Sequence, residues 1–301
     1  MIENFEDFCV WMYVVVDDIW EGLAPLFARP GPDPGCSDAE LIAMTLIGEC
    51  RGWDLETQLL ANFRERRDLF PILPSQSRYN RRRRQLYQGF NLVRRAVLAL
   101  LDLAWDRQGA IDSLPVPVAG FHLAPCCSRE WAVNGASFGK VASKKLTIYG
   151  YKLHMLVTLG GVILDFALAP AHVSELEAGE ELLREHTDLD VYGDKGYIGR
   201  AIKEALEEEH GIRLHTVSRR NQVEQTPPGV RRLINGARQI IETVNSQLSE
   251  QFSIERNRAH TFLGLCARLH SKLAAHTLCI YLNRLLGEPD FLRIKQLPLT
   301  I

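Results

Sequence analysis

The chain has 301 residues, of which 46% are hydrophobic, and a formal net charge of −2. This length suggests about two domains, each with a real core. The charge excludes a protein that is basic over its whole surface, but it leaves room for a local basic patch.

The cysteines exclude a disulfide framework and a zinc ribbon. There are 7, an odd number, and none of them forms a CxxC pair. We therefore expect reduced thiols in a cytoplasmic protein. Cys126 and Cys127, near His122, could form a soft-metal site, but adjacent residues rarely aim both side chains at one ion. No signal peptide is evident, and the apolar run 8–16 is too short to cross a bilayer, which takes about 20 residues.

Residues 1–105 have the pattern of a helical domain. A capping box, Ser37 followed by Glu40, predicts the start of one helix. Segments rich in proline, 29–35 and 71–74, separate the helices. Apolar periodicity predicts the others over residues 2–28, 55–63, 77–88 and, as a helix or linker, 92–105.

A cluster of arginines lies in this helical part. From Leu69 to Leu101 there is no acidic residue, whereas seven arginines are present, with Tyr79, Tyr87 and Phe90 between them. The cluster is either a solvated helix face or, because guanidinium groups without acids repel one another, a surface for a polyanion. We expect a DNA-binding domain, for which helix-turn-helix is one arrangement. The predicted DNA-binding residues are Arg78, Arg81, Arg82, Arg83 and Arg84.

Residues 106–301 have the pattern of an α/β domain. Predicted strands cover 110–118, 146–159, 162–169, 190–192 and 212–217, and predicted helices cover 175–185, 201–209 and the region around 238–249. Gly160-Gly161 indicates a hairpin, and a polar stretch containing Arg129, Lys140, Lys144 and Lys145 precedes it. Three antiparallel strands followed by αβ crossovers predict a mixed sheet with helices on its faces, an RNase H-like layout with the first strand in the centre.

Three acids in this domain are candidates for catalysis. Asp112 and Asp194 lie at or near the ends of strand-like runs, and Glu242 lies on the polar side of an amphipathic helix, four residues after Arg238. In one interpretation, Asp112 and Asp194 are ordinary turn residues and Glu242 forms a surface ion pair with Arg238. In the other, all three acids are ligands of a two-metal site. Mg²⁺ prefers oxygen ligands, and two ions about 3.5–4 Å apart can clamp both reacting oxygens of a phosphodiester.

Four motifs follow one another within residues 106–301. They are Asp112-Ser113, Tyr149-Gly150-Tyr151-Lys152-Leu153-His154, Gly193-Asp194-Lys195-Gly196-Tyr197 and Arg238-(three residues)-Glu242-Thr243-Val244. In this order they resemble the bacterial insertion-sequence DDE transposases, with the insertion-sequence-982 family as the nearest in pattern. The similarity runs over most of residues 37–285, including the helical Ser77-Arg78-Tyr79-Asn80-Arg81-Arg82.

The resemblance implies that Asp112, Asp194 and Glu242 are the catalytic triad of an RNase H-like domain. They would bind two Mg²⁺ ions, which Mn²⁺ could replace, for cleavage of DNA at the element ends and joining to target DNA. Lys195 either contacts a phosphate or occupies an exposed turn, and Arg238 would contact DNA. The chain departs from the wider superfamily at Asn235 and Ser249, where relatives often have Tyr and Lys.

Synapsis of two DNA ends implies a homodimer, and the DNA substrate implies a nucleoid-associated protein of the bacterial cytoplasm. Two rival functions remain open. One is an RNase H-like nuclease that does not join strands, and the other is a DNA-binding regulator whose catalytic domain is inactive. We expect His154 to be a core or edge histidine rather than a ligand, and we do not expect His172 to bind a metal.

Overall fold

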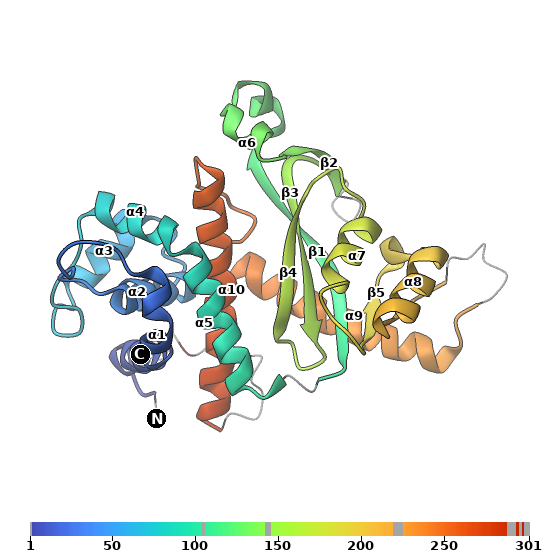
Figure 1. Ribbon diagram of the computed structural model, residues 1–301, viewed down its shortest axis with the longest axis horizontal. Coiled ribbons are helices and arrows are strands. Elements are labelled where there is room, and N and C mark those ends of the chain that lie inside the picture. Colours follow the sequence, from blue (N-terminus) through green and yellow to red (C-terminus); the bar gives the residue numbers. More distant parts are fainter. Residues whose placement is uncertain are drawn as a thin grey trace. The chain divides into compact units, whose positions relative to one another are not determined.

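A computed structural model of the chain describes residues 2–103, 106–141, 146–218 and 225–287, together with 293, 294 and 297. The chain divides into two compact units. The helical unit contains Met1–Ala104, Leu248–Ile254 and Arg258–Ile301, and the sheet unit contains Trp105–Gln247 and Glu255–Asn257. Each unit is described separately below, with the elements labelled in Figure 1.

The helical unit is formed by α1, α2, α3, α4, α5 and α10. Their bounds are Phe5–Leu23, Asp38–Cys50, Glu56–Arg64, Gln76–Gln85, Tyr87–Leu100 and Phe262–Leu285, and a 3₁₀ turn, η1, covers Ala24–Phe27. The predicted capping box is confirmed, because Ser37 Oγ accepts from Glu40 N and Glu40 Oε2 accepts from Ser37 N. The chain turns between α4 and α5 at Leu86, whereas the sequence predicts one helix over 77–88.

Two helices form the interior of the helical unit. In α2 nearly every residue is buried, and in α10 burial extends all round the helix from Leu265 to Asn283. A helix that is buried on every side has to be enclosed by other elements. The surrounding helices supply large core side chains such as Met12, Phe63 and Phe90. α10 packs against α2, α4 and α5, so the C-terminal part of the chain completes the N-terminal fold.

The sheet unit is built on a six-stranded mixed sheet. Its strands are β1 (Gln108–Ala119), β2 (Ser137–Val141), β3 (Leu146–Thr158), β4 (Ile163–Pro170), β5 (Asp190–Gly193) and β6 (Arg213–Thr216). The order is β2-β3-β1-β5-β6, and β4 also pairs with β3. β1 is antiparallel to β3 and parallel to β5, which confirms the expectation that the strand bearing Asp112 lies beside the strand leading to Asp194.

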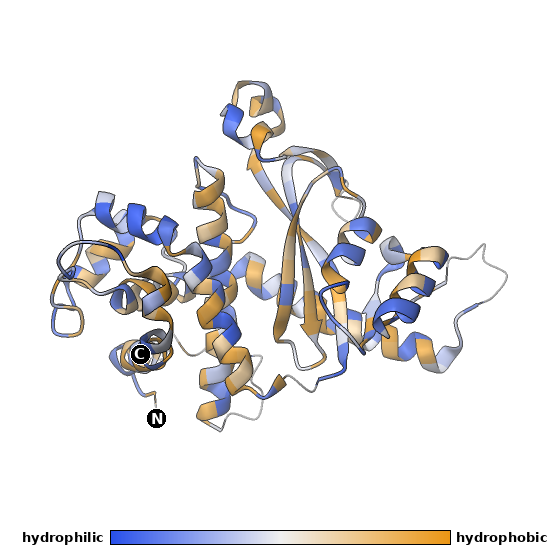
Figure 2. Cartoon of the chain, viewed as in Figure 1, coloured by the Kyte–Doolittle hydropathy of each residue, from blue (hydrophilic) through white to orange (hydrophobic). Residues whose placement is uncertain are grey.

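Helices cover both faces of this sheet. α7 (Glu175–Leu183) and α8 (Arg200–His210) pack on one face, where Ile111 and Val191 belong to a hydrophobic cluster with Leu182 and Leu206. α8 is clearly two-sided in hydropathy, with charged residues opposite the buried Leu206 (Figure 2). Because side chains alternate along a strand, Asp112 projects from the other face, where it meets α9 (Pro228–Glu250).

The structure adds elements that the sequence did not predict. They are β2, the short helix α6 (Arg129–Val133), the 3₁₀ turns η3 (Phe121–Cys126) and η4 (Lys195–Tyr197), and α10. Lys144 and Lys145 of the predicted polar stretch lie outside the described residues. Among the described residues, no helix is long and apolar enough to span a bilayer.

The predicted division into a DNA-binding domain at 1–105 and a catalytic domain at 106–301 stays a prediction in its functional sense. The compact units change one residue earlier, between Ala104 and Trp105. They also differ from the predicted bounds towards the C-terminus, where Leu248–Ile254 and Arg258–Ile301 join the helical unit.

Candidate active site

The first two predicted acids lie on neighbouring parallel strands. Ile111 of β1 pairs with Gly193 of β5, and the next residue along each strand is Asp112 or Asp194. Asp194 keeps an extended backbone at the start of η4. Ile111 lies in the hydrophobic cluster on one face of the sheet, and Gly193 is its neighbour in the pairing. Because side chains alternate along a strand, the side chains of Asp112 and Asp194 project to the opposite face.

One side of α9 contacts both of these acids. Arg238, Glu242 and Asn245 recur at spacings of four and three, which places them on the same side of the helix. Arg238 Nη1 lies 3.5 Å from Asp194 Oδ1, and its Nη2 lies 3.4 Å from Glu242 Oε1. Asn245 Nδ2 donates to Asp112 Oδ2 at 2.8 Å. The three predicted acids are therefore connected through two side chains of α9.

The apolar side of α9 sets the direction in which its polar side faces. Its buried residues follow the helical period and are all apolar: Ile234, Ala237, Ile241, Val244 and Leu248. Burial of this stripe fixes the rotation of the helix about its axis. The polar side is consequently more open, and the Glu242 side chain is 62% exposed.

Asp112 lies in an environment that disfavours its charge. The pKa of Asp112 is raised from 3.8 to about 6, mainly by burial and also by the negative charges of Glu175 and Asp194. A backbone hydrogen bond from Ser113 and the positive charge of Arg238 act in the opposite direction. Repulsion among these neighbouring carboxylates contributes to the raised pKa, and a bound cation would relieve that repulsion.

Glu175 is a fourth acid at this site that sequence reasoning missed. It is the first residue of α7, and Ser113 Oγ donates to its Oε1 at 3.4 Å. A Cβ added at Gly196 would lie 1.9 Å from Glu175 Oε2, so only glycine leaves room for the carboxylate there. In the sequence Glu175 is indistinguishable from the acids that commonly begin a helix.

The motif Gly193-Asp194-Lys195-Gly196-Tyr197 is held in place by its aromatic residue. The Tyr197 ring is buried against glycine, since a Cβ at Gly179 would lie 2.6 Å from it and one at Gly193 would lie 3.2 Å from it. Burial raises the pKa of Tyr197 well above its ordinary value, and the charge of Asp112 raises it further. The buried ring thus anchors the short turn that presents Asp194.

The donor set fits a hard divalent cation. Four carboxylates gather around this end of the sheet, and Arg238 is the one cation shown in contact with them among the described residues. Carboxylate oxygens are the ligands that Mg²⁺ and Mn²⁺ prefer. No group of three acidic, histidine or cysteine side chains in the described part of the chain is already arranged for one ion. Arg238 instead lies between Asp194 and Glu242.

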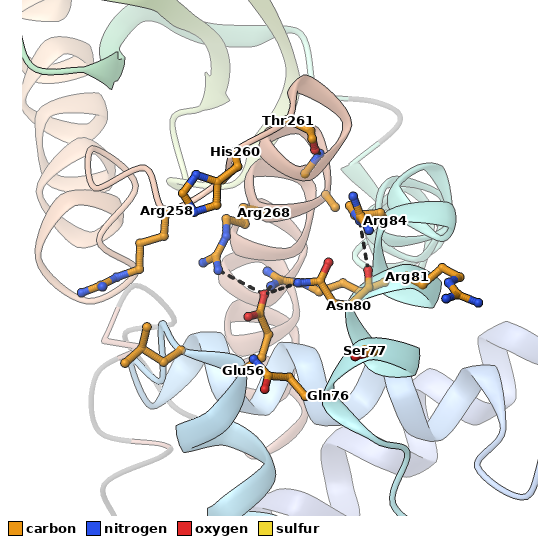
Figure 3. A pocket seen from close by; sticks show the side chains of 15 residues that line it. Glu56, Gln76, Ser77, Asn80, Arg81, Arg84, Arg258, His260, Thr261 and Arg268 are labelled. Atoms are coloured by element: carbon orange, nitrogen blue, oxygen red, sulfur yellow. Dashed lines mark hydrogen bonds and ion pairs between the residues drawn. The ribbon is translucent and has the colours of Figure 1, made fainter. Parts of the chain in front are cut away.

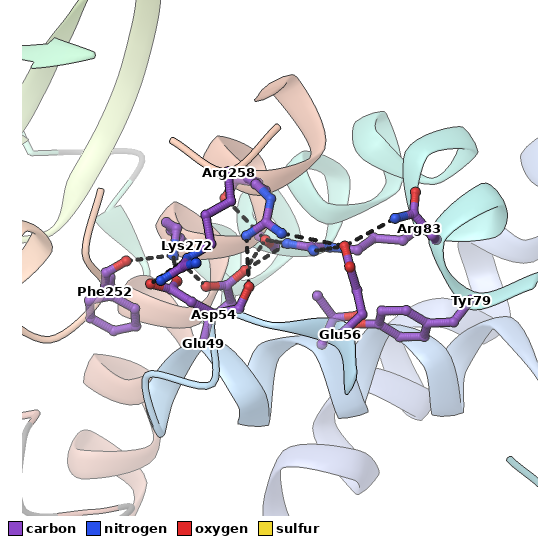
Figure 4. Close-up of polar contacts among 12 residues, drawn as sticks. Glu49, Asp54, Glu56, Tyr79, Arg83, Phe252, Arg258 and Lys272 are labelled. Carbon is purple, nitrogen blue, oxygen red and sulfur yellow. Dashed lines mark hydrogen bonds and ion pairs between the residues drawn. The ribbon is translucent and has the colours of Figure 1, made fainter. Parts of the chain in front are cut away.

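Two of the predicted DNA-binding arginines are buried in ion pairs. Arg82 is 9% exposed, donates to Asp38 from Nε at 2.8 Å and also donates to the backbone oxygen of Phe27. Arg83 is 6% exposed, and its Nη2 lies 2.8 Å from Glu49 Oε1 (Figure 4). The expectation that this cluster has no acids to pair with is wrong, because the acids come from α2 and α3, distant in sequence.

The other predicted DNA-binding residues are accessible. Arg78 and Arg81 are exposed on α4, and Arg84 is half-buried. Lys195 is exposed in η4, directly after Asp194. Asn235 is exposed on α9. A DNA contact by Arg78, Arg81, Arg84, Lys195 or Arg238 stays a prediction, and none was predicted for Asn235.

The histidines and thiols add no second site. His154 is fully buried in β3, and burial lowers its pKa to about 4, as suits a neutral core residue. His172 Nδ1 lies 2.8 Å from Ser137 Oγ. Cys126 and Cys127 are free thiols, and no metal-binding group that includes them occurs in the described ranges.

Comparison with known families gives one match. A family model described as Transposase DDE domain matches residues 106–278, which is more than half of the chain. No curated protein matches the chain, and no solved structure matches it either. The matched range includes β1, β5 and α9, and hence every acid of the candidate site.

Proposed function

Since the chain belongs to the Transposase DDE domain family, we propose that it is an insertion-sequence transposase that cuts DNA at the element ends and joins the freed 3′-hydroxyl to target DNA. The observation that carries this proposal is the contact of one polar helix side with both strand-end acids. Within the family, the motifs favour the insertion-sequence-982 group, and the strand order favours an RNase H-like fold.

The proposed catalytic and metal-binding residues are Asp112, Asp194 and Glu242. When bound, two Mg²⁺ or Mn²⁺ ions would activate the attacking oxygen and stabilise the leaving oxygen of the phosphodiester. We add Glu175 to the acidic set, because its charge acts on Asp112. The raised pKa of Asp112 means that the free enzyme holds a proton on this carboxyl more readily than an ordinary aspartate does.

Two residues of α9 would position these acids. Asn245 donates to one oxygen of Asp112 and thereby fixes the orientation of the carboxylate. Arg238 bridges Asp194 and Glu242, and it would offset part of their charge before DNA binds. In the reaction the guanidinium group would turn from these acids to a DNA phosphate, a geometry that arginine serves well.

The wider functional setting is also part of the proposal. The partners would be the terminal inverted repeats and target DNA, and a homodimer would hold two ends together. The protein would then act at the nucleoid of the bacterial cytoplasm. Residues 1–105 would bind DNA, and residues 106–301 would carry the chemistry.

A strand-transfer assay tests this function. The substrate is a linear DNA that carries the coding sequence with its native flanks, incubated with the full chain, Mg²⁺ and a supercoiled target plasmid. We expect cut ends and joined products from the wild type, and a loss of at least 100-fold for Asp112→Asn, Asp194→Asn and Glu242→Gln. Glu208→Gln is the matched control, because Glu208 is exposed on α8, on the other face of the sheet.

The products separate the rival functions. Cut ends without any joined product would favour a nuclease. DNA binding that persists with neither cutting nor joining, and that Asp194→Ala leaves unchanged, would favour a catalytically inactive regulator.

A further inference from the structure

A large polar pocket lies within the helical unit. Its volume is about 850 Å³, and its walls come from the start of α3, from α4, and from the segment that leads into α10 (Figure 3). Figure 3 shows Arg258 and His260 on one side, and Arg81 and Arg84 on the other, with Glu56 and Arg268 between them. Residues far apart in sequence therefore contribute basic groups to one cavity.

The single acid in the wall is already neutralised. Glu56 Oε1 lies 3.3 Å from Arg268 Nη2, accepts from Asn80 Nδ2 at 3.1 Å, and lies 3.8 Å from Arg83 Nη1. No other acidic residue is among those that line the pocket. Glu56 therefore compensates the buried arginines and leaves the accessible ones without a carboxylate partner in the wall.

Two accessible arginines of the pocket wall have no carboxylate partner in the described part of the chain. Among the described residues, no carboxylate lies within ion-pair distance of Arg81 or Arg84. Arg258 has one acidic neighbour, Asp54, at the limiting distance of 4.0 Å. Such a set attracts an anion with several negative charges.

The start of α10 adds a further positive contribution. Thr261 is the N-cap of this 24-residue helix, and its Oγ1 accepts from Gly264 N. Both residues line the pocket, and Arg84 lies close, since a Cβ added at Gly264 would be 3.7 Å from Arg84 Cδ. The N-terminus of a helix carries a partial positive charge and suits a phosphate group.

The described residues of the pocket wall include no large aromatic ring on which a base could stack. Apart from His260, its residues are arginines, short polar residues and small aliphatic ones, with no Phe, Tyr or Trp. Proteins that bind single strands hold successive bases by stacking them on such rings. The lining is suited to contacts that position a backbone rather than to contacts that specify a base.

We infer that this pocket binds the phosphate backbone of duplex DNA, with Arg81, Arg84, Arg258 and His260 as its contacts and the α10 N-terminus beside them. The inference rests on the proposed function and refines it. It removes Arg82 and Arg83 from the DNA surface and adds residues 258–261, which follow the catalytic helix in the chain. Because the contacts are to phosphates, this binding is independent of sequence.

Fluorescence anisotropy with a labelled random-sequence 30-bp duplex tests the inference on the full chain over a series of salt concentrations. Each phosphate contact contributes about −0.9 to the slope of log affinity against log salt, which is about eightfold in affinity at 0.1 M salt. For Arg81→Gln/Arg84→Gln we expect the slope to flatten by about 1.8 and the affinity at 0.1 M salt to fall about 60-fold. His260→Gln tests the other wall independently, with a smaller loss in the same direction.

Arg64→Gln is the matched control, because Arg64 is an exposed arginine in the last turn of α3, outside the pocket. It should keep the wild-type slope and affinity. Circular dichroism melting checks that each variant is folded. If folded pocket variants bind with the wild-type slope, the pocket inference is overturned while the transposase proposal stands. If the wild type binds no duplex at any salt concentration, the failure lies with the proposed function itself.

Discussion

Glu49 is the residue whose loss should most disturb the helical unit. It lies on α2 at 6% exposure, with Arg83 Nη2 at 2.8 Å, Lys272 Nζ at 2.7 Å and Ser271 Oγ donating at 2.8 Å (Figure 4). Lys272 is also buried, and its other partners are Asp54 and the backbone oxygen of Phe252. The substitution Glu49→Gln keeps the shape of the side chain and removes only its charge.

The magnitude follows from what remains after this change. Two buried cations lose their shared carboxylate, and removal of one partner of a buried ion pair costs about 3–5 kcal/mol. The free energy of unfolding should fall by that amount. For a unit of this size, the melting temperature should fall by about 6–20 °C. Glutamine recovers only part of the loss. Its carbonyl oxygen can still accept from one of the two cations, but its NH2 group is a donor and would face the other cation, which needs an acceptor.

Differential scanning calorimetry of the full chain measures this effect. Glu65→Gln is the control, since Glu65 is exposed at the end of α3, and it should lie within about 0.5 kcal/mol of the wild type. In a double-mutant cycle, adding Lys272→Met should cost less than it does alone, because the unpaired cation is then gone. A Glu49→Gln protein within about 1 kcal/mol of the wild type would refute the view that this network is needed to keep the buried arginine.

Three further outcomes follow from the same geometry. Burial opposes the charge of Glu49, but Lys272 and Arg83 outweigh this effect and lower the pKa of Glu49 below 4.5. The stability that the charged carboxylate contributes is therefore present above pH 4.5 and should be lost as pH falls through the lower native pKa, which an acid titration of unfolding measures. In a urea titration, Gly179→Ala should destabilise the sheet unit by about 1–3 kcal/mol, because the new methyl group meets the Tyr197 ring, and strand cleavage should fall with it. Gly236→Ala, in open space on α9, is the control and should be neutral or stabilising by up to about 1 kcal/mol. Mn²⁺ at 100 times its dissociation constant should raise the free energy of unfolding of the wild type by about 2.7 kcal/mol, seen as a higher melting temperature than in EDTA. An equal rise in Asp112→Asn would contradict metal binding at that residue.

The sequence predicted the sheet well because its signals are local. Apolar runs of strand length and the Gly160-Gly161 hairpin signal located β1, β3 and β4, and the order of strands and helices indicated that β1 would lie beside β5. The sequence predicts only that the helix bearing Glu242 approaches the sheet near Asp112. Which side chain of α9 makes the contact depends on which side of the helix is buried. Asn245 makes that contact, yet in the sequence it is one polar residue among several on the same side.

The sequence failed where partners are distant. The run from Arg81 to Arg84 looks uniform, but Arg82 and Arg83 point inward to Asp38 and Glu49, because α4 packs on α2. Once the buried side of α4 is known, the helical period is enough to separate the inward Arg82 and Arg83 from the accessible Arg81 and Arg84. Glu175 was missed for a similar reason, since its meaning comes from Gly196 and Ser113 in other elements.

The enclosure of α10 by the N-terminal helices affects how the protein is made. A nascent chain that has emerged as far as α5 lacks the segment that fills its own interior, and at about 5–20 residues per second that segment follows some 10–35 s later. During this interval α2 and α5 expose apolar surface that attracts chaperones or proteases. A product of premature termination before Phe262 would stay in that state, so only synthesis beyond α10 gives a helical unit with a filled interior.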